Sequence, residues 1–400
     1  MRRNTPFSAR PWSEIRKRLL DAIADDPITS GRTITYLPKD AVREHAYDTM
    51  GIVAGAYDWG SKTAAMLLDE TSAMVRPFFQ AGAEVPVTFT SGGSESNILA
   101  LKAARDWARA NRPQALRPEI LMSRAAHSCH SKAAQLLGLA ERRVGLAPDS
   151  RTDISAMAAA IGPDTIALVA SYPTDSHGMC DDVPAIAALA EHHGLWCHVD
   201  ASFGGFIAPF LKELGEPLPD FDFRVAGVSS IAADLHKYGY APTGISVLLL
   251  RTAAHAEHLR FQFDAWDGPA MDSDRLSGTR SFDTLAGAWA TLQELGWEGF
   301  RERAAAMRAN SRRFLDRLKD IDGVELLNRP EIGIVHFRVA GADAASLGAA
   351  LRQRGHRPYV TVAPAGIILC IGPELQDDVL ETFMRDFAHA RRTVESAGPA

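Results

Sequence analysis

The sequence is poor in cysteine and contains no long hydrophobic run. The few cysteines show no paired spacing of the kind that binds a metal ion: Cys129, Cys180, Cys197 and Cys370. We therefore expect reduced thiols and a cytoplasmic location. No run of about eighteen apolar residues occurs, so a membrane span is not expected. The N-terminal end, MRRNTP, is basic but lacks the apolar stretch of a signal peptide.

Charge of one sign is not concentrated anywhere in the chain either. The formal net charge is -6 at pH 7, and no block of like charges is present. Both features argue against a nucleic-acid partner. Hydrophobic residues make up 46% and charged residues 23% of the 400 positions, as in an ordinary globular enzyme. This length exceeds what one small core needs, so we expect two domains.

Strand-like and helical segments alternate through the first two thirds of the chain. Alternation of this kind predicts parallel strands joined by helices, in an α/β sheet that binds ligands at its strand ends. An amphipathic helix is also expected near the N-terminus, at residues 11–24. The expected strands are 86–90, 119–122, 165–171, 195–199 and 244–250, and the expected helices are 62–79, 132–139 and 183–192.

The composition shifts at residues 262–274, where Asp, Gly and Pro cluster. Beyond this point we expect a long helix and then a smaller α+β unit with its own core. Its segments are 285–318, 324–327, 333–339, 344–354, 366–371 and 375–395. The sequence thus predicts an N-terminal segment (1–60), a large domain (61–270) and a small C-terminal domain (271–400).

Lys237 has unusual surroundings for a lysine, because apolar residues, aromatics, glycines and a histidine flank it in ADLHKYGY. A lysine in partly apolar surroundings has a lowered pKa and can form a Schiff base with a carbonyl group. Asp200 ends the apolar segment LWCHV and offers the carboxylate that a pyridinium nitrogen needs as its partner. Together the two residues indicate pyridoxal phosphate.

A glycine pair followed by Ser94 lies between an expected strand and an expected helix. Glycines such as Gly93 let backbone amides approach an anion closely, and the dipole at a helix N-terminus favours negative charge. The motif is therefore suited to a phosphate. An ordinary capped helix start, with Ser94 as the N-cap, explains the same residues equally well.

Two further positions follow expected strands. His127 could stack on a planar cofactor or shuttle a proton, although a lone histidine is more often structural. Period-two alternation puts His198, Asp200 and Ser202 on one face of the chain, where Ser202 could lie against the cofactor ring. A helix cap or a buried salt bridge is the structural alternative for Asp200.

Polar residues near Lys237 complete the set of candidates. The hydroxyl groups of Ser229 and Ser230 and the imidazole of His236 are expected near the phosphate end of a cofactor. The turn SGTRS either binds an anion or caps the helix after it. No metal site is expected, because the histidines at 192–193 and at 127 and 130 lack a matching carboxylate pattern.

Several runs of sequence, in this order, resemble pyridoxal-phosphate enzymes of the aspartate-aminotransferase fold, which is also called fold type I. More narrowly, they resemble the branch that contains sphingosine-phosphate lyase and the group II amino-acid decarboxylases. The resemblance covers roughly residues 60 to 320. The runs are FTSGGSESNILALKAARD, AAHSCHSKAAQLLGL, HGMCDDVPAIAALAEHHGLWCHVDASFGGFIAPF and GVSSIAADLHKYGYAPTG.

The resemblance implies a mostly parallel, seven-stranded type of sheet, a small-molecule amine substrate and a role for each site residue. Lys237 would carry the cofactor and Asp200 would bind its pyridine nitrogen. His127 and Ser202 would lie on opposite faces of the ring. The residues implied to hold phosphate are Gly93, Ser94 and His236, with Gly278 and Thr279 reaching the phosphate of a neighbouring subunit in a homodimer that shares its active sites.

Within this branch, two carbon–carbon lyase reactions stay open. The chain resembles the archaeal tyrosine/aspartate decarboxylases in HVDASFGGFIAPF, and it resembles sphingosine-phosphate lyase in HKYGYAPTG. The lyase has a substrate-phosphate-binding lysine where this chain has Thr243, and its upstream Asn-Pro-Leu-His-type segment is replaced by AYDWG. We therefore predict amino-acid decarboxylation first and retro-aldol cleavage of a phosphorylated amino alcohol as the alternative.

Other functions fit the sequence less well. An aminotransferase usually needs a small-domain arginine for the α-carboxylate, for which Arg338 and Arg357 are unmatched candidates. A cysteine desulfurase would have glutamine where Phe203 stands. A purely binding or regulatory module would be favoured by loss of Lys237 or Asp200, and both are present. Substrate side chains are expected to contact the N-terminal segment around Tyr36, Tyr57 and Trp59.

Overall fold

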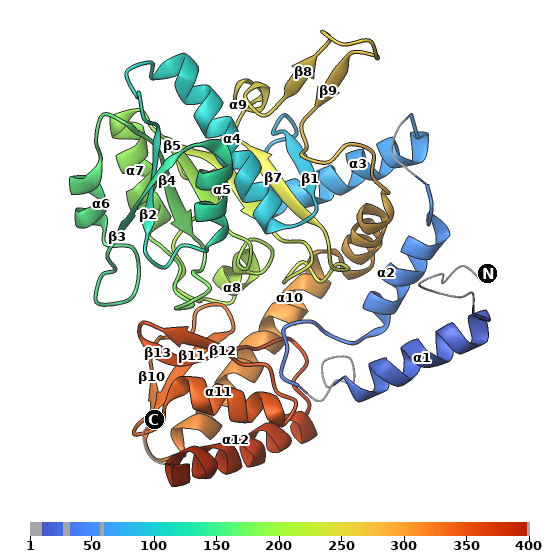
Figure 1. Ribbon diagram of the computed structural model, residues 1–400, viewed down its shortest axis with the longest axis vertical. Helices are drawn as coiled ribbons and strands as arrows, with labels where there is room; N and C mark the ends of the chain where they lie inside the picture. The colour runs from blue at the N-terminus through green and yellow to red at the C-terminus, as the bar shows by residue number, and fades with distance from the viewer. Residues whose placement is uncertain (1–9, 27–32, 57–59, 398–400) are drawn as a thin grey trace, which may run out of the picture.

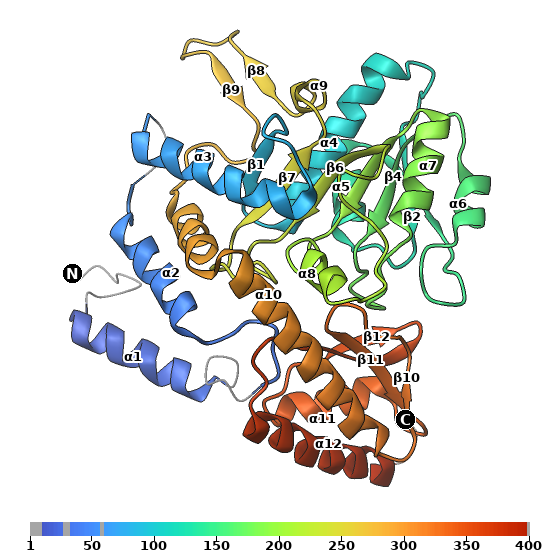
Figure 2. The same cartoon turned by 180° about the vertical axis from the view of Figure 1, so that it is seen from behind.

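The structure is a computed structural model that describes residues 10–26, 33–56 and 60–397 (Figure 1). Helices pack around a seven-stranded sheet, and a four-stranded sheet lies towards the C-terminus. The opposite view shows the long helix α10 (Asp283–Lys319) running from the region of the large sheet to the small one (Figure 2). The predicted mixed α/β class is confirmed.

The large sheet has the strand order β1-β7-β6-β5-β4-β2-β3. Six strands run in one direction and β7 runs against them, because β7 pairs antiparallel with both β6 and β1. The connection from β6 to β7 contains no helix, whereas parallel neighbours are usually joined by a helical crossover. The strands are β1 (Val87–Thr90), β2 (Glu119–Ser123), β3 (Ala140–Val144), β4 (Thr165–Ser171), β5 (Trp196–Asp200), β6 (Val228–Ala233) and β7 (Ser246–Leu250).

The prediction of a mostly parallel sheet is thus confirmed, although β3 and β6 were not among the expected strands. The turn between β6 and β7 carries Lys237. The antiparallel direction of β7 was not predicted. It goes with the connection at residues 234–245, which contains no crossover helix in the described structure.

Helices cover both faces of the large sheet. Ile120 and Met122 of β2 pack in a cluster with helices α4 and α5, whereas Leu121 between them joins the cluster that includes α7. The expected helix 62–79 is α-helical only to Val75 and continues as one 3-10 turn, η1, that contains Pro77. The helices are α3 (Lys62–Val75), α4 (Gly93–Asn111), α5 (Cys129–Leu137), α6 (Ile154–Ala160), α7 (Val183–His193), α8 (Ala208–Glu213) and α9 (Ala253–Glu257), with η1 at Arg76–Phe79.

The C-terminal part has a separate hydrophobic cluster. The residues Phe314, Phe337, Phe383 and Phe387 are fully buried there. The small sheet is antiparallel, in the order β10-β11-β13-β12. The domain boundaries at residues 60/61 and 270/271 remain predictions. The elements are β10 (Val324–Leu326), β11 (Ile334–Val339), α11 (Ala344–Gln353), β12 (Tyr359–Val362), β13 (Ala365–Cys370) and α12 (Asp377–Ala397).

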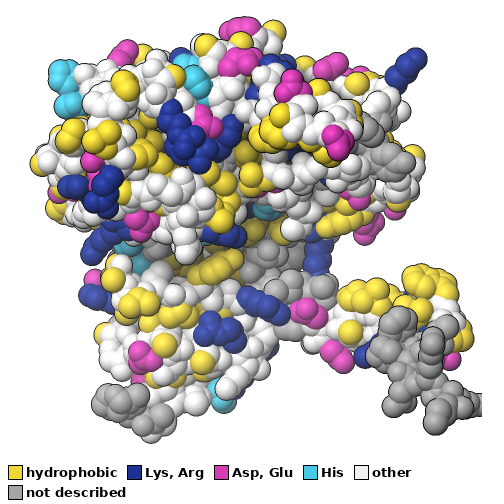
Figure 3. Space-filling view, turned by 45° about the horizontal axis from the view of Figure 1, so that its top comes forward, with side chains coloured by type: hydrophobic (Ala, Val, Ile, Leu, Met, Phe, Trp, Pro, Cys, Tyr) yellow, Lys and Arg dark blue, Asp and Glu magenta, His cyan; other side chains and the backbone are white. Residues whose placement is uncertain are grey.

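Two elements project from the body of the molecule. Helix α1 (Trp12–Asp25) has no buried residue, so its apolar stripe faces solvent. A hairpin of β8 (Phe261–Phe263) and β9 (Met271–Ser273) also exposes large hydrophobic side chains, whereas α2 (Ala41–Ile52) packs against α10. Hydrophobic side chains are visible on the projecting segment at the lower right of Figure 3. No helix in the described part of the chain is long and apolar enough to cross a membrane.

Candidate active site

A cavity of about 320 Å³ opens at the ends of β4 and β5, where ligands bind in parallel sheets. The start of α4 and the turn after β6 form other parts of its wall. Many of the residues predicted from the sequence line this cavity together: Gly93, Ser94, His127, Asp200, Ser202, His236 and Lys237. Segments more than a hundred residues apart thus supply one site.

Lys237 lies in the wall between carboxylate groups and an aromatic ring. Its Nζ is 3.0 Å from Oδ2 of Asp234 and 3.9 Å from the centroid of the Phe203 ring. Burial lowers the pKa of Lys237, but the charges of Asp234, Asp175 and Asp200 outweigh burial and raise the pKa above its ordinary value. The predicted lowering of the pKa of Lys237 is therefore wrong for the free amine.

Asp200 ends β5 with a carboxylate that receives hydrogen bonds from two side chains. The hydroxyl of Ser202 donates to Oδ1, and Nδ2 of Asn97 donates to Oδ2 at 3.0 Å. Burial opposes ionisation, yet His130, the Ser202 hydrogen bond, His198 and Lys237 together lower the pKa of Asp200 below its usual value. An ionised carboxylate therefore faces the cavity.

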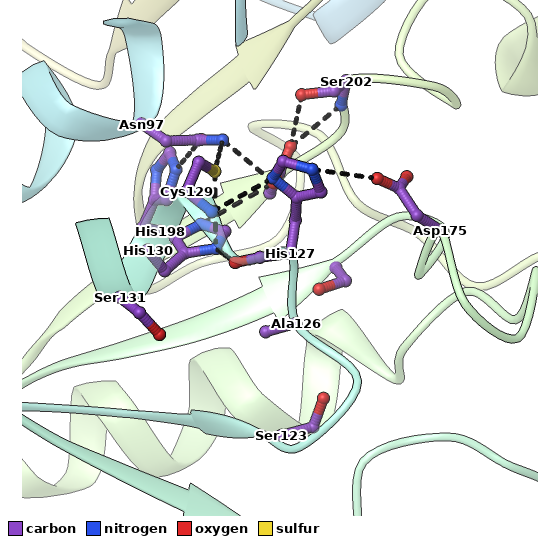
Figure 4. A network of polar contacts seen from close by, with 12 residues as sticks. Asn97, Ser123, Ala126, His127, Cys129, His130, Ser131, Asp175, His198 and Ser202 are labelled. Carbon is purple, nitrogen blue, oxygen red and sulfur yellow. Dashed lines mark hydrogen bonds and ion pairs between the residues drawn. The ribbon is translucent and has the colours of Figure 1, made fainter. Parts of the chain in front are cut away.

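Two buried histidines, His130 and His198, lie beside Asn97 and Cys129 (Figure 4). Burial lowers the pKa of His130, whose Nε2 lies 3.7 Å from Oδ2 of Asp200 without a hydrogen-bond partner. His198 contacts Oδ1 of Asn97 at 2.8 Å, and burial lowers the pKa of His198 to about 3.

Ser230 does not reach the cavity, contrary to the prediction that it contacts the cofactor. Its side chain is fully buried in β6, where its hydroxyl contacts Nε1 of Trp196 at 2.8 Å and Nδ1 of His198 at 2.9 Å. Ser230 therefore supports His198 from behind. Ser229, its neighbour, accepts a hydrogen bond from the backbone amide of Cys197 and is also outside the cavity wall.

Helix α4 begins at the glycine pair, with Gly92 rather than Ser94 in the N-cap position. The capping alternative for Ser94 is therefore not what the structure shows, and Ser94 is exposed at the cavity. A Cβ atom on Gly93 would lie 2.7 Å from Oγ of Ser202 and 2.8 Å from Oδ1 of Asp234, so a larger residue would displace these two side chains. Free amides at this helix start suit an anion.

His236 lies beside this helix start. Its Nδ1 donates to the carbonyl oxygen of Ile245 at 2.7 Å, and its Cε1 is 3.5 Å from where a Cβ of Gly92 would be. The hydrogen bond fixes the ring against the turn that carries Lys237. The imidazole is thus held at the end of the cavity where the amides of α4 begin.

His127 and Asp175 face each other across another part of the cavity (Figure 4). Nε2 of His127 is 3.6 Å from Oδ2 of Asp175, and Nδ1 of His127 accepts a hydrogen bond from the backbone amide of Cys129 at 3.2 Å. The side chains of His127 and Asp175 are 45% and 38% exposed, so both are accessible from the cavity. Burial raises the pKa of Asp175, and the positive charges of Lys237 and His127 oppose that rise.

Sequence reasoning missed Asn97, Cys129, Asp175 and Asp234 among the cavity residues. A signal was available for two of them. Asn97 is one helical turn after Gly93 and so shares its helix face, and Asp175 follows an expected parallel strand at its carboxyl end. Burial raises the pKa of Cys129 to about 12, so this thiol is protonated at neutral pH.

Other predicted residues are elsewhere. Gly278 and Thr279 form an exposed turn outside the cavity wall, and Thr243 is also exposed. Arg338 pairs with Glu325 at 2.7 Å on the small sheet, and Arg357 lies 3.6 Å from Asp26; neither lines the cavity.

The N-terminal segment contributes an aromatic contact near the lysine. Tyr36 packs against the rings of Phe203 and Tyr238, with centroids 5.6 Å away in both cases, and burial raises the pKa of Tyr36 to about 12. Tyr57 and Trp59, which were expected to contact the substrate, lie outside the described residues.

The donors present fit pyridoxal phosphate at both of its ends. An ionised, hydrogen-bonded carboxylate meets the need of a pyridinium nitrogen, and a glycine cradle at a helix start meets the need of a phosphate. A primary amine lies on the same cavity wall. A chain with this sheet and this set of donors falls in the class of fold type I pyridoxal-phosphate enzymes.

Comparison with known families gives the narrower assignment. The model of the pyridoxal-dependent decarboxylase conserved domain matches residues 64–340. The chain belongs to this family, whose cofactor is pyridoxal phosphate. The predicted family and cofactor are thereby confirmed.

Individual relatives divide between two kinds of lyase. The chain is 31% identical over 341 residues to the sphingosine-1-phosphate lyase of Oryza sativa. This match covers 84% of this chain and 63% of the relative. It is 33% identical over 301 residues to an L-aspartate/L-glutamate decarboxylase of Pyrococcus horikoshii. This second match covers 74% of this chain and 75% of the relative. The chain thus spans less than two thirds of the plant lyase.

Solved structures agree with the fold. The sphingosine-1-phosphate lyase of Burkholderia pseudomallei superposes with a TM-score of 0.90 at 29% identity, covering 99% of this chain and 94% of that chain. The glutamate decarboxylase of Lactobacillus brevis superposes with a TM-score of 0.84 at 20% identity, covering 100% and 96%. The second likeness is one of fold alone.

Proposed function

We propose that this protein is a carbon–carbon lyase that acts at the α-carbon of a small amine substrate, with amino-acid decarboxylation as its first candidate reaction. The observation that carries the proposal is the presence of Lys237 and an ionised Asp200 in the wall of one cavity. Pyridoxal phosphate, when bound, supplies an electron sink for the bond that breaks. The protein has to hold that group, place the substrate and handle the protons.

Each cavity residue that was predicted from the sequence has a proposed part in this. Lys237 is the residue that would carry the cofactor, and Asp200, fixed by Asn97 and Ser202, would hold its ring nitrogen protonated. Gly93, Ser94 and His236 would hold the phosphate at the start of α4. His127 would lie over one face of the ring and Ser202 against the other.

The choice of reaction depends on which α-carbon bond the protein holds perpendicular to the cofactor ring. Decarboxylation is supported by the absence of a lysine at the exposed Thr243 and by the likeness to the archaeal decarboxylase. Retro-aldol cleavage is the second candidate, because the Burkholderia pseudomallei lyase matches nearly the whole chain. An aminotransferase is less well supported, since Arg338 and Arg357 both lie outside the cavity wall.

Two substrate panels separate the candidates. Purified holoenzyme is incubated with amino acids, with release of CO2 and amine as the readout, and in parallel with phosphorylated amino alcohols, with aldehyde as the readout. We expect CO2 and amine from at least one amino acid. Aldehyde release without CO2 would overturn the preference for decarboxylation, and neither product from any substrate would overturn the lyase assignment.

We also propose a cytoplasmic homodimer with shared active sites. The cysteines are all unpaired and buried, which suits a reducing compartment. Exposed apolar side chains on α1 and on the β8–β9 hairpin, which include Trp12 (69% exposed) and Phe261 (53%), support a protein interface. Gly278 and Thr279, in their exposed turn, would then reach the cofactor phosphate of the partner subunit.

A further inference from the structure

Asp175 is a charged residue of the cavity wall to which the proposed function gives no role. It follows β4 in the segment Tyr172-Pro173-Thr174-Asp175, and it lines the cavity beside His127 and Lys237. Asp200 and Asp234 are at most 8% exposed, whereas the side chain of Asp175 is 38% exposed. Among the carboxylates of Asp175, Asp200 and Asp234, it is therefore the one that a bound molecule meets most directly.

The contacts of His127 determine where its proton is. The backbone amide of Cys129 donates to Nδ1 at 3.2 Å, so Nδ1 is an acceptor and the neutral ring carries its proton on Nε2. This Nε2 lies 3.6 Å from Oδ2 of Asp175. In the described part of the chain, His127 is the one ion-pair partner of Asp175 at this range. The Nδ1 edge of the ring is thus held by a backbone donor, and the Nε2 edge faces a carboxylate that attracts the ring when it is protonated.

We infer that Asp175 is a positioning residue for His127. The carboxylate of Asp175 keeps the Nε2–H edge of the His127 ring turned into the cavity and stabilises the protonated form of this ring. The inference rests on the proposed lyase function and adds to it. In decarboxylation, the bond between the α-carbon and the carboxyl group breaks, CO2 leaves, and the α-carbon takes up one proton. Nε2 of His127 supplies this proton and regains one from water, because the ring is 45% exposed.

Because Asp175 has other charged groups near it, the test must separate an effect on His127 from an effect on Lys237. Burial raises the pKa of Asp175, while Lys237 and His127 oppose the rise and Asp200 and Asp234 add to it. Asp175 could therefore act on Lys237 instead of on His127. The titration of His127 itself distinguishes the two, so the test follows this ring directly.

The test is the pH titration of His127 by ¹⁵N NMR in the holoenzyme, compared between the wild-type protein and Asp175→Asn. The spectrum of His127→Gln identifies the signal. The amide removes the charge at nearly constant size, so we expect the titration midpoint of His127 to fall. The alkaline limb of kcat should move down with it, with KM within about twofold, because proton delivery and not binding is affected.

A matched control is Glu141→Gln on β3. The side chain of Glu141 is 37% exposed and lies 3.8 Å from Arg143, so it is a carboxylate of similar exposure that does not line the cavity. We expect no change in the midpoint of His127 in this variant and restoration of the midpoint in Asp175→Glu. Asp175→Ser carries the same expectation as Asp175→Asn if the amide variant fails to fold.

Two results would overturn the inference. One is an unchanged midpoint of His127 in Asp175→Asn. The other is a shift in the pH response of the cofactor's visible absorption without a shift of His127, which would assign Asp175 to Lys237. If no substrate is cleaved by the wild-type enzyme, the proposed function fails, while the NMR midpoint still decides the role of Asp175.

Discussion

The ionised state of Asp200 depends on neighbours that are distant in sequence. Asn97, which donates to it, lies 103 residues away, and the same amide side chain contacts His198. Local sequence patterns therefore located Lys237, Asp200 and Gly93, because each sits in a distinctive short run. The contacts of Asn97 with Asp200 and His198, in contrast, exist only once the strands are assembled.

The charge of Asp200 can be removed without changing its shape. We expect Asp200→Asn to keep its fold, since replacing a buried carboxylate by an amide removes a desolvation cost. It should bind pyridoxal phosphate more weakly and lose roughly 100-fold or more in kcat, as when a preorganised electrostatic contact is deleted. Cofactor titration by fluorescence and steady-state kinetics measure both effects. Near-wild-type turnover would contradict the role of Asp200.

At the scale of elements, the sequence predicted where the strands end better than how the elements contact each other. Residues of β4 and β5 were expected within one position, because continuous apolar runs mark buried strands. The loop after β4, which carries Asp175, packs on the small sheet through His177, whose ring lies 5.9 Å from that of His336 on β11. Nothing local in either segment indicates this pair.

The contact between His177 and His336 predicts a pH-dependent stability. Burial lowers the pKa of His336 to about 4, and it also lowers the pKa of His177. A folded pKa below the unfolded value of roughly 6.5 means that the unfolded state binds more protons below that pH. Stability is therefore full above about pH 6.5 and falls as the pH decreases towards 4, by up to about 3 kcal/mol for His336.

Urea unfolding at a series of pH values measures this dependence. His336→Gln should show a shallower loss of unfolding free energy between about pH 6.5 and 4 than the wild-type protein. The control His389→Gln, at an exposed position on α12, should keep the wild-type slope. If the unfolding free energy fell equally steeply with decreasing pH in the wild-type protein and in His336→Gln, protonation of His336 would not be the cause of the stability loss.

At the scale of the whole molecule, the projecting helix α1 is the clearest sign of a larger assembly. Its stripe of Trp12, Ile15, Leu19 and Ile23 is at least 41% exposed at every position. The helix was expected from its periodicity, but which surface covers the stripe depends on another chain. Exposed side chains of this size on a helix that buries none of its residues are best explained by a partner.

We expect the protein to sediment as a dimer and Leu19→Glu to weaken that dimer by roughly tenfold or more, because a charge enters an apolar contact. Leu116→Glu is the matched control, since Leu116 is a leucine outside α1 that is 85% exposed, compared with 58% for Leu19. Analytical ultracentrifugation over a concentration series gives both dissociation constants. A monomeric wild-type protein, or equal effects of the two changes, would contradict the proposed interface.

The central claim is that Lys237 carries pyridoxal phosphate in the cavity that Asp200 completes. Its most direct test is reduction of the purified holoenzyme with borohydride, followed by digestion and mass spectrometry of the labelled peptide. We predict one cofactor-labelled lysine, Lys237, in the peptide that contains ADLHKYGY, and no stable label in Lys237→Ala. A label on another lysine, or an undiminished label in Lys237→Ala, would contradict the account.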